Sequence, residues 1–410
     1  MNTRRGWSAA RIGYCSNVHP APDLATLSAS IETHFQGVRQ QRGLPEQDSG
    51  LWISAQAAAE LQQPQALTGF LRLLRHSGLR LTSLNGFPYG QFHQGAVKAE
   101  VYLPNWADPQ RLEYSLQLAR ILAAALPEDC PKGVISSVPL GYAATWSLAH
   151  RQRAEQQLRQ LTLALARLRR ETGKQILFCL EMEPDCVLEH TDQAIEFFRR
   201  WQATDPHHEH LALCFDVCHQ AVVFEHCHDA LERLRQAGVP VGKIQLSNAL
   251  ICRLPEADPL RRQQVLTALG DFVEATYLHQ VKARDHQGCL LAWPDLPAAL
   301  QAGELASCPE LRIHFHVPLF SEQLLLPELS GSQSALLQTF DYLAEHPEVR
   351  PVLEVETYSW NVLPAPLRPQ TEQALLQGIV AELRWVEGQL RERQLLSAPS
   401  PAQEACPHGV

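Results

Sequence analysis

Four short apolar segments of this chain each end in side chains that can bind a divalent metal ion. Carboxylates and imidazoles are costly to remove from water, so a buried strand end that carries them needs a compensating partner. Four such ends, separated by helical segments, indicate one shared partner, and a divalent cation is the simplest candidate. The segments are CLEME at 179–183, FDVCH at 215–219, IHFHV at 313–317 and LEVET at 353–357.

Strand periodicity places the polar side chains of each segment on one face. Side chains alternate across a strand, so residues two apart share a face. Asp216 would lie at the tip of its strand, with His219 three residues further on. The polar faces would point toward a common axis and the apolar faces toward surrounding helices. The pairs that share a face are Glu181 with Glu183, His314 with His316, and Glu354 with Glu356.

The elements that would position these residues alternate between strand and helix patterns. Helical periodicity is clearest in 24–38, 112–122, 146–171 and 370–393. Eight such alternations predict a parallel sheet closed as a (β/α)₈ TIM barrel in a single domain, 1–395. A doubly wound open sheet is the alternative, although no glycine-rich phosphate-binding sequence follows the first strand. The predicted strands are 11–18, 50–56, 79–85, 132–138, 175–183, 211–217, 241–247 and 351–357.

Two connections are too long to be ordinary loops. They are insertions of about 86–108 after the third strand and 251–330 after the seventh. Both leave the carboxyl end of a strand, the face on which barrel enzymes place their sites, so we expect them to build walls or a lid. Residues 396–410 have the composition of a disordered tail.

Composition excludes several classes of partner. The formal net charge is −9, which argues against nucleic acid. No window approaches the roughly 20 apolar residues of a transmembrane segment, and no signal peptide is visible. Eleven cysteines occur without CxxC spacing, which predicts reduced thiols in a cytoplasmic protein.

The candidate metal-binding residues resemble those of a known superfamily. Glu181 on the fifth strand, Asp216-x-x-His219 on the sixth and Glu356 on the eighth look like the metal framework of xylose isomerase-like barrels. That superfamily contains sugar isomerases, ketose 3-epimerases and zinc-dependent abasic-site endonucleases. The resemblance implies the xylose isomerase-like form of the barrel and a small sugar-like substrate.

A closer resemblance covers nearly the whole chain. The sequence is similar to the EboE-type "metabolite traffic" family, whose gene clusters also encode a prenyltransferase and a sugar-phosphate cyclase-like enzyme. The resemblance implies functional partners from the same biosynthetic cluster and establishes no reaction. The segments that carry it are NGFPYG at 85–90, the stretch 98–106, SSVP at 136–139, YLHQV at 277–281 and HFHVP at 314–318.

The expected metal ligands are Glu181, Asp216 and Glu356, with Gln245 or His316 completing the set. The epimerase relatives usually have a histidine where Gln245 stands, and a glutamine carbonyl is a weaker ligand than imidazole. Either Gln245 binds weakly, or His316 or His279 replaces it, or the site has decayed. An oxygen-dominated set favours Mn²⁺ or Mg²⁺, and more histidine favours Zn²⁺ or Co²⁺.

The leading hypothesis is a metal-dependent isomerase or epimerase for a sugar or a sugar-derived polyol. The cation would polarise neighbouring carbonyl and hydroxyl oxygens, and Glu181 or Glu356 would remove the proton beside the carbonyl. Glu183 is a further base, and His219 would orient a hydroxyl and move its proton. The candidate substrate-binding residues are Asn85, Tyr89, His219, His279, His314 and Trp360.

Other interpretations remain open. The three carboxylates can instead form salt bridges to Lys243 or Arg312, and His314 and His316 can simply bridge neighbouring strands. A metal-dependent phosphoester hydrolase and a non-catalytic metabolite carrier are the alternative functions. The cluster HHEH at 207–210 precedes the sixth strand, which places it on the face opposite the predicted site.

Overall fold

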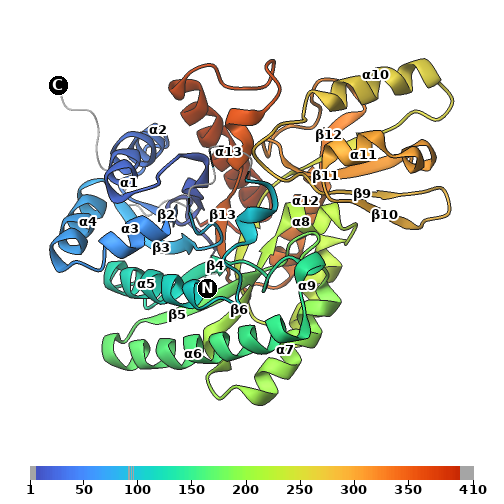
Figure 1. Cartoon of the computed structure of the whole chain (residues 1–410). Helices are drawn as coiled ribbons and strands as arrows, with labels where there is room; N and C mark the ends of the chain where they lie inside the picture. The colour runs from blue at the N-terminus through green and yellow to red at the C-terminus, as the bar shows by residue number, and fades with distance from the viewer. Residues whose placement is uncertain (1–5, 91–92, 94, 96, 398–410) are drawn as a thin grey trace, which may run out of the picture.

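The computed structural model describes residues 6–90, 93, 95 and 97–397 (Figure 1). Eight parallel strands form one sheet in the order β1-β13-β7-β6-β5-β4-β3-β2. A further parallel bridge between Cys15 and Gly50 joins the first strand to the second and closes the predicted TIM barrel. The strands are β1 (Gly13–Tyr14), β2 (Gln47–Trp52), β3 (Leu79–Asn85), β4 (Lys132–Ser137), β5 (Gln175–Glu181), β6 (Leu211–Asp216), β7 (Val241–Leu246) and β13 (Val352–Val355).

Helices connect successive barrel strands and cover the outside of the sheet (Figure 1). The longest begins after Ser147, whose hydroxyl accepts the backbone N–H of His150, and ends at Gly173, where φ is 72°. The helices are α1 (Leu24–Ser30), α2 (Gln36–Gln41), α3 (Ala55–Glu60), α4 (Pro64–His76), α5 (Pro109–Ala125), α6 (Leu148–Thr172), α7 (Thr191–Thr204), α8 (Val217–Val222), α9 (Cys227–Gln236), α12 (Gln333–Glu345) and α13 (Glu372–Glu392).

The second strand begins and ends earlier than the sequence pattern predicts. The expected range is 50–56, whereas β2 ends at Trp52. Ser54 instead caps α3 by accepting the backbone N–H of Ala57, so the apolar run continues into a helix start. The first strand is also short, because residues 16–18 form a 3₁₀ turn.

The barrel interior contains a fully buried ion pair. Lys243 Nζ donates to Glu354 Oε1 at 2.6 Å, and their side chains are 0% and 1% exposed. Gly50 faces this pair, and a Cβ atom at that position would lie 1.7 Å from Glu354 Oε2. Glycine is therefore required at position 50 for Glu354 to cross the barrel to Lys243.

A second, antiparallel sheet follows β7 in the chain, over most of the segment predicted as the second insertion. Its strand order is β10-β9-β11-β8-β12. It lies beside the barrel with two further helices, in yellow and orange at the upper right of Figure 1. The elements are β8 (Ala249–Arg253), α10 (Pro259–Gly270), β9 (Val281–Arg284), β10 (Leu290–Trp293), α11 (Leu296–Gln301), β11 (Glu310–His316) and β12 (Leu329–Gly331).

The segment predicted as a disordered tail begins with residues that contact the chain before the first barrel strand. Leu396 forms a parallel bridge with Trp7, and the backbone N–H of Ser397 donates to Trp7 O at 2.7 Å. The rest of the predicted tail lies outside the described residues. In the part of the chain that the structure describes, no helix has the length and apolar character needed to cross a membrane.

Candidate metal and substrate site

Three carboxylates from three different strands meet at the carboxyl end of the barrel. Glu181 ends β5, Asp216 ends β6, and Glu356 follows β13. One oxygen from each lies within 4.8 Å of the other two, and the residues are 3%, 0% and 5% exposed. The predicted carboxylate ligands are therefore brought together, rather than being separated by salt bridges to Lys243, which pairs with Glu354.

The hydrogen bonds of these carboxylates leave specific oxygens unused. Asn17 and Asn85 both donate to Glu356 Oε1, at 2.7 and 3.0 Å. Ser247 donates to Asp216 Oδ1 at 2.7 Å. Glu181 Oε2 and Asp216 Oδ2 have no hydrogen-bond partner within the described part of the chain. Buried oxygens without donors require either protonation or a cation.

Mutual repulsion alters the acidity of these carboxyl groups. Burial and the neighbouring Asp216 raise the pKa of Glu356 to about 8. Burial, Glu356 and Asp216 raise the pKa of Glu181 well above its usual range. Each charge makes ionisation of the next carboxyl costlier unless a positive charge enters the cluster.

Gln245 and His316 supply further unused polar atoms beside the carboxylates. Gln245 is the register partner of Asp216 on the adjacent strand, and both of its side-chain amide atoms lack a partner among the described residues. His316 Nε2 is likewise unpartnered there, and His316 groups with Asp216 and His219 within ligating distance. These oxygen-rich donors, together with an imidazole, fit a divalent cation.

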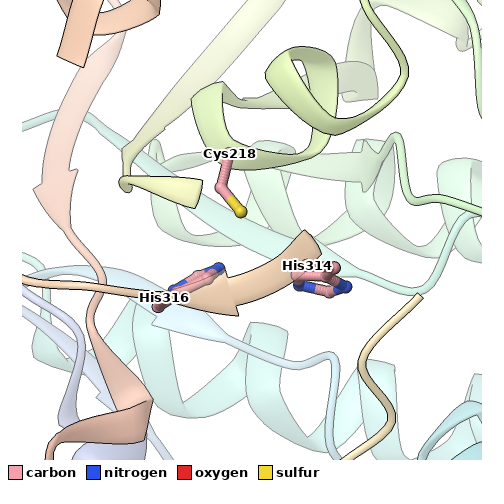
Figure 2. Close-up of side chains that lie close together, drawn as sticks. All are labelled: Cys218, His314 and His316. Atoms are coloured by element: carbon pink, nitrogen blue, oxygen red, sulfur yellow. The ribbon is translucent and has the colours of Figure 1, made fainter. Parts of the chain in front are cut away.

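The two histidines of the IHFHV segment come from the second sheet and not from a barrel strand. Both lie at the carboxyl end of β11, so the second sheet projects them over the barrel mouth. Figure 2 shows Cys218 of α8 pointing toward this strand, with His314 and His316 on it. Burial lowers the pKa of His316 to about 4 and that of His314 well below its usual value, which keeps both rings neutral at pH 7.

His219 and Glu183 join the carboxylate and histidine groups. His219 Nε2 lies 3.1 Å from His314 Nε2 and 3.3 Å from Glu183 Oε2. Burial alone would lower the pKa of His219, but the charges of Asp216 and Glu183 raise it overall. Burial raises the pKa of Glu183. An imidazole and a carboxylate in this contact can hold or pass a proton at the cavity surface.

Most of these groups line a cavity that opens to solvent. Its volume, with the part open to solvent included, is about 600 Å³. Residues of both predicted insertions form much of its wall, and most of these are apolar or aromatic. The polar lining residues are Asn17, Asn85, Lys98, Glu181, Glu183, His219, His314, His316 and Glu356. The remaining lining residues are Phe87, Pro88, Val97, Val101, Tyr102, Tyr277, Leu278 and Tyr358.

Three residues predicted to bind substrate do not line this cavity. The ring of Tyr89 packs on Tyr114, with centroids 5.2 Å apart. His279 is held between His314 O and Glu274 Oε1, at 2.8 and 2.9 Å. The place of these residues in aromatic or polar segments of the sequence did not reveal that their side chains point away from the cavity.

Trp360 also turns away from the cavity, toward a buried carboxyl group on α13. Its indole Nε1 donates to Glu382 Oε2 at 3.1 Å. Glu382 Oε1 accepts the hydroxyl of Thr357 at 2.6 Å and the backbone N–H of Leu319 at 3.1 Å. Glu382 therefore fastens the segment after Glu356 to the helix behind it. Burial outweighs these three hydrogen bonds and raises the pKa of Glu382 to about 7.

Glu382 is expected to make stability depend on pH. Its folded pKa lies above the ordinary value of 4.5, so its favourable contribution is complete below pH 4.5 and is lost as the pH rises through 7. Glu382→Gln removes that titration. The unfolding free energy of wild type relative to this variant should fall between pH 5 and 8 by up to about 3 kcal/mol. Urea unfolding at four pH values measures it. The exposed Glu392→Gln serves as control, and parallel curves for wild type and Glu382→Gln would contradict the prediction.

Several residues of the site were not identified from the sequence. Tyr102 donates its hydroxyl to Glu183 Oε1 at 2.8 Å and accepts from Gln280 Nε2 at 2.7 Å. Asn17 follows the first strand, where carboxyl-end polar residues of a barrel are expected, so its position was a usable signal. Nothing in the sequence pattern pairs Tyr102 and Gln280, which belong to separate insertions.

Comparisons with known proteins identify the fold. No protein-family model matches the sequence, and no curated protein does. The chain is similar to the crystal structure of a xylose isomerase-like TIM barrel protein from Mycobacterium smegmatis in complex with magnesium. The TM-score is 0.52 at 12% identity, covering 96% of this chain and 99% of that one.

Two further solved structures have lower TM-scores. D-allulose 3-epimerase from Methylomonas sp. has a TM-score of 0.49 at 10% identity, covering 94% of this chain and 99% of that one. The probable 3-DHS dehydratase AsbF from Bacillus anthracis has 0.46 at 13% identity, covering 92% and 98%. At such identities the Mycobacterium likeness establishes the TIM-barrel fold and leaves the reaction to the site itself.

Proposed function

We propose that this protein is a divalent-metal-dependent isomerase or epimerase that acts on a sugar or a sugar-derived polyol. One observation carries the proposal: Glu181, Asp216 and Glu356 converge at the barrel mouth, and Glu181 Oε2 and Asp216 Oδ2 have no donor among the described residues. Three buried carboxylates in mutual contact are stable in their ionised form only beside a positive charge. A divalent cation supplies that charge and gives the cluster a chemical use.

The proposed ligands are Glu181, Asp216 and Glu356, with Gln245 or His316 completing the set. Their oxygen-rich character favours Mn²⁺ or Mg²⁺, and a larger share of histidine favours Zn²⁺ or Co²⁺. When bound, such an ion acts as a Lewis acid toward adjacent carbonyl and hydroxyl oxygens of the substrate. The Mycobacterium barrel was crystallised with magnesium, in agreement with a hard divalent ion.

The chain's own residues supply the proton transfer and the positioning. Glu356 is the first candidate for the base, because Asn17 and Asn85 fix one of its oxygens at the cavity surface. Glu181 is the second, since its Oε2 is uncommitted. His219 donates Nδ1–H to Met182 O at 2.6 Å, which aims Nε2 at the cavity, where it can orient a substrate hydroxyl. Glu183 is positioned by Tyr102 to exchange a proton with His219.

Solvent exchange of a carbon-bound proton tests the proposed reaction. Protein loaded with Mn²⁺ is incubated in deuterated water with a panel of ketoses, aldoses and inosose-like polyols, and deuterium is followed by NMR. Wild type should incorporate deuterium beside the carbonyl, and Glu356→Gln should lower the rate at least about 100-fold. Glu348→Gln, an exposed change, is the matched control. Equal rates in wild type and Glu356→Gln would contradict the assignment of Glu356 as the base.

The alternative functions have distinct signatures in the same samples. The replacement of a family histidine by Gln245 favours a non-catalytic metabolite-binding or traffic protein, which would bind ligand without exchange or metal. Phosphate release would instead indicate a metal-dependent phosphoester hydrolase. The EboE-type resemblance, cytoplasmic localisation and partners from the same gene cluster belong to this proposal as well.

A further inference from the structure

The two insertions contribute a partly buried apolar wall to the cavity. Val97 and Val101 come from the first insertion, and Tyr277 and Leu278 come from the second. Branched aliphatic side chains cannot hydrogen-bond to the hydroxyl groups of a sugar, so a hydroxyl placed against them would lose its hydrogen bonds to water. An apolar group in the same place would instead gain the free energy of removing both surfaces from water.

Lys98 fastens the two insertions to each other beside this wall. Its Nζ donates to Tyr277 O at 2.7 Å and to Asp295 Oδ2 at 2.8 Å. It also donates to Glu274 O at 3.2 Å, and the backbone N–H of Lys98 donates to Thr276 O at 3.0 Å. The φ of Lys98 is 42°, a strained value for a lysine, which persists only where surrounding contacts hold the backbone. The apolar wall is therefore part of the folded structure and does not need a ligand to form it.

The same contacts leave the cavity without an available ammonium or guanidinium group. Lys98 is the one lysine or arginine that lines the cavity within the described chain. An ammonium group has three N–H donors, and the three acceptors around Lys98 occupy all of them. Phosphate groups are usually bound by uncommitted lysine or arginine donors. The cavity is therefore poorly suited to a phosphorylated sugar.

Aromatic rings connect the polar groups of the cavity to the apolar wall. The ring centroid of Tyr358 lies 4.5 Å from that of His316 and 5.0 Å from that of Tyr277. Leu278 follows Tyr277 in the chain and lines the same cavity. A ligand with its polar end at the carboxylates can therefore extend past these two tyrosines to the aliphatic side chains.

We propose that the substrate is an unphosphorylated sugar or polyol that carries an apolar substituent, and that Val97, Val101 and Leu278 bind this substituent. The inference rests on the proposed function, because the carbonyl and hydroxyl groups of the ligand are assigned to the carboxylate cluster. A bare sugar would leave the aliphatic side chains in contact with water or with its own hydroxyl groups. An alkyl or aryl substituent covers them.

A homologous series of 1-hydroxy-2-alkanones tests the apolar wall. Every member has the same neutral pair of carbonyl and hydroxyl groups, while the alkyl chain grows from hydroxyacetone to 1-hydroxy-2-octanone. Full-length protein loaded with Mn²⁺ is titrated with each compound in a calorimeter. The Kd should fall about fourfold for each added methylene until the chain extends beyond the wall. Dihydroxyacetone phosphate should bind no more tightly than dihydroxyacetone.

Two variants locate the apolar contact. Val101→Thr keeps the shape of the side chain and adds a hydroxyl to the wall, and Leu278→Asn replaces an aliphatic group with an amide. Each should weaken the binding of 1-hydroxy-2-octanone about fivefold or more and leave that of hydroxyacetone unchanged. Val273→Thr is the matched control, because Val273 is 39% exposed and does not line the cavity.

The inference is overturned if the Kd for wild type does not change with chain length, or if 1-hydroxy-2-octanone does not bind. Tighter binding of dihydroxyacetone phosphate than of dihydroxyacetone would also overturn it, as would unchanged octanone binding in both variants. If Val101→Thr failed to fold, the series in wild type and Leu278→Asn would still decide the question.

The series measures binding alone, so its outcome is separate from that of the deuterium-exchange experiment. Dependence on chain length without deuterium exchange would contradict the isomerase proposal and support the apolar wall as a ligand-binding surface. Exchange of deuterium in a protein whose Kd is independent of chain length would support the isomerase and contradict the apolar substituent.

Discussion

Asp216→Asn is expected to weaken Mn²⁺ or Mg²⁺ binding at the carboxylate cluster by about 100-fold or more while the barrel stays folded. Asparagine keeps an Oδ1 that can accept from Ser247 and from the backbone N–H of His219, as the wild-type carboxylate does at 2.7 and 3.0 Å. The change is confined to Oδ2, which has no partner in the described protein. Loss of groups behind a ligand already costs 10- to 100-fold, so loss of the ligand's charge should cost at least as much.

The effect of Asp216→Asn on the free energy of unfolding should have opposite signs with and without the metal ion. In metal-free protein Asp216→Asn removes one of three repelling carboxylates, so it should be as stable as wild type or more stable. Added Mn²⁺ at about 100 times its Kd should stabilise wild type by about 2.7 kcal/mol and the variant far less. Urea unfolding with and without Mn²⁺ measures both.

A matched change at the other end of the barrel separates metal loss from general damage. Asp205 is also a buried aspartate, but it precedes β6 and accepts the Thr162 hydroxyl at 2.7 Å. Asp205→Asn should leave the Mn²⁺-dependent stabilisation unchanged. If Asp216→Asn retained the full Mn²⁺ effect, the carboxylate cluster would not be the metal site.

Lys243→Met is expected to destabilise the protein by about 3–5 kcal/mol. The lysine is 0% exposed and donates to Glu354 at 2.6 Å, so its removal leaves a buried carboxylate without its charged partner. Methionine preserves most of the side-chain volume, which limits any cavity contribution. Lys243 also lowers the pKa of Glu356, so its loss should shift the titration of the cluster upward. Chemical denaturation at pH 7 measures the stability change.

A double-mutant cycle distinguishes the ion pair from simple packing. Lys243→Met combined with Glu354→Gln removes both charges and should be less destabilised than the sum of the two single changes, by about 2 kcal/mol or more. Additive losses of stability would mean that packing, and not the pair of charges, determines the contribution of these two residues to stability. Gly50→Ala is a useful third variant, since its methyl group would overlap the Glu354 carboxylate and displace it.

Much of the barrel could be predicted from the sequence because parallel strands are buried on both faces. Such strands are short apolar runs bounded by turns, and all eight expected runs correspond to β1–β7 and β13. The carboxylates were predictable for a related reason: polar residues at the ends of apolar strands meet at one end of any closed barrel. Glu181, Asp216 and Glu356 needed no knowledge of side-chain direction beyond strand parity.

The rest of the site depends on contacts that a linear pattern does not encode. His314 and His316 were singled out by their spacing, yet the strand that carries them belongs to a separate sheet whose docking on the barrel has no sequence signature. Trp360 follows the eighth strand, as Glu356 does, but pairs with Glu382 on α13. Whether a residue beyond a strand end turns inward or outward is decided by such distant partners.

The cavity depends on β11 of the antiparallel sheet as well as on the barrel strands. His314 reaches His219 across 95 residues of chain, and only after the antiparallel sheet has docked. The barrel strands position the carboxylates, whereas β11 of the antiparallel sheet carries His314 and His316. A substitution that loosens the docking of the antiparallel sheet should therefore displace the cavity wall formed by β11 and leave the carboxylates of the barrel strands together.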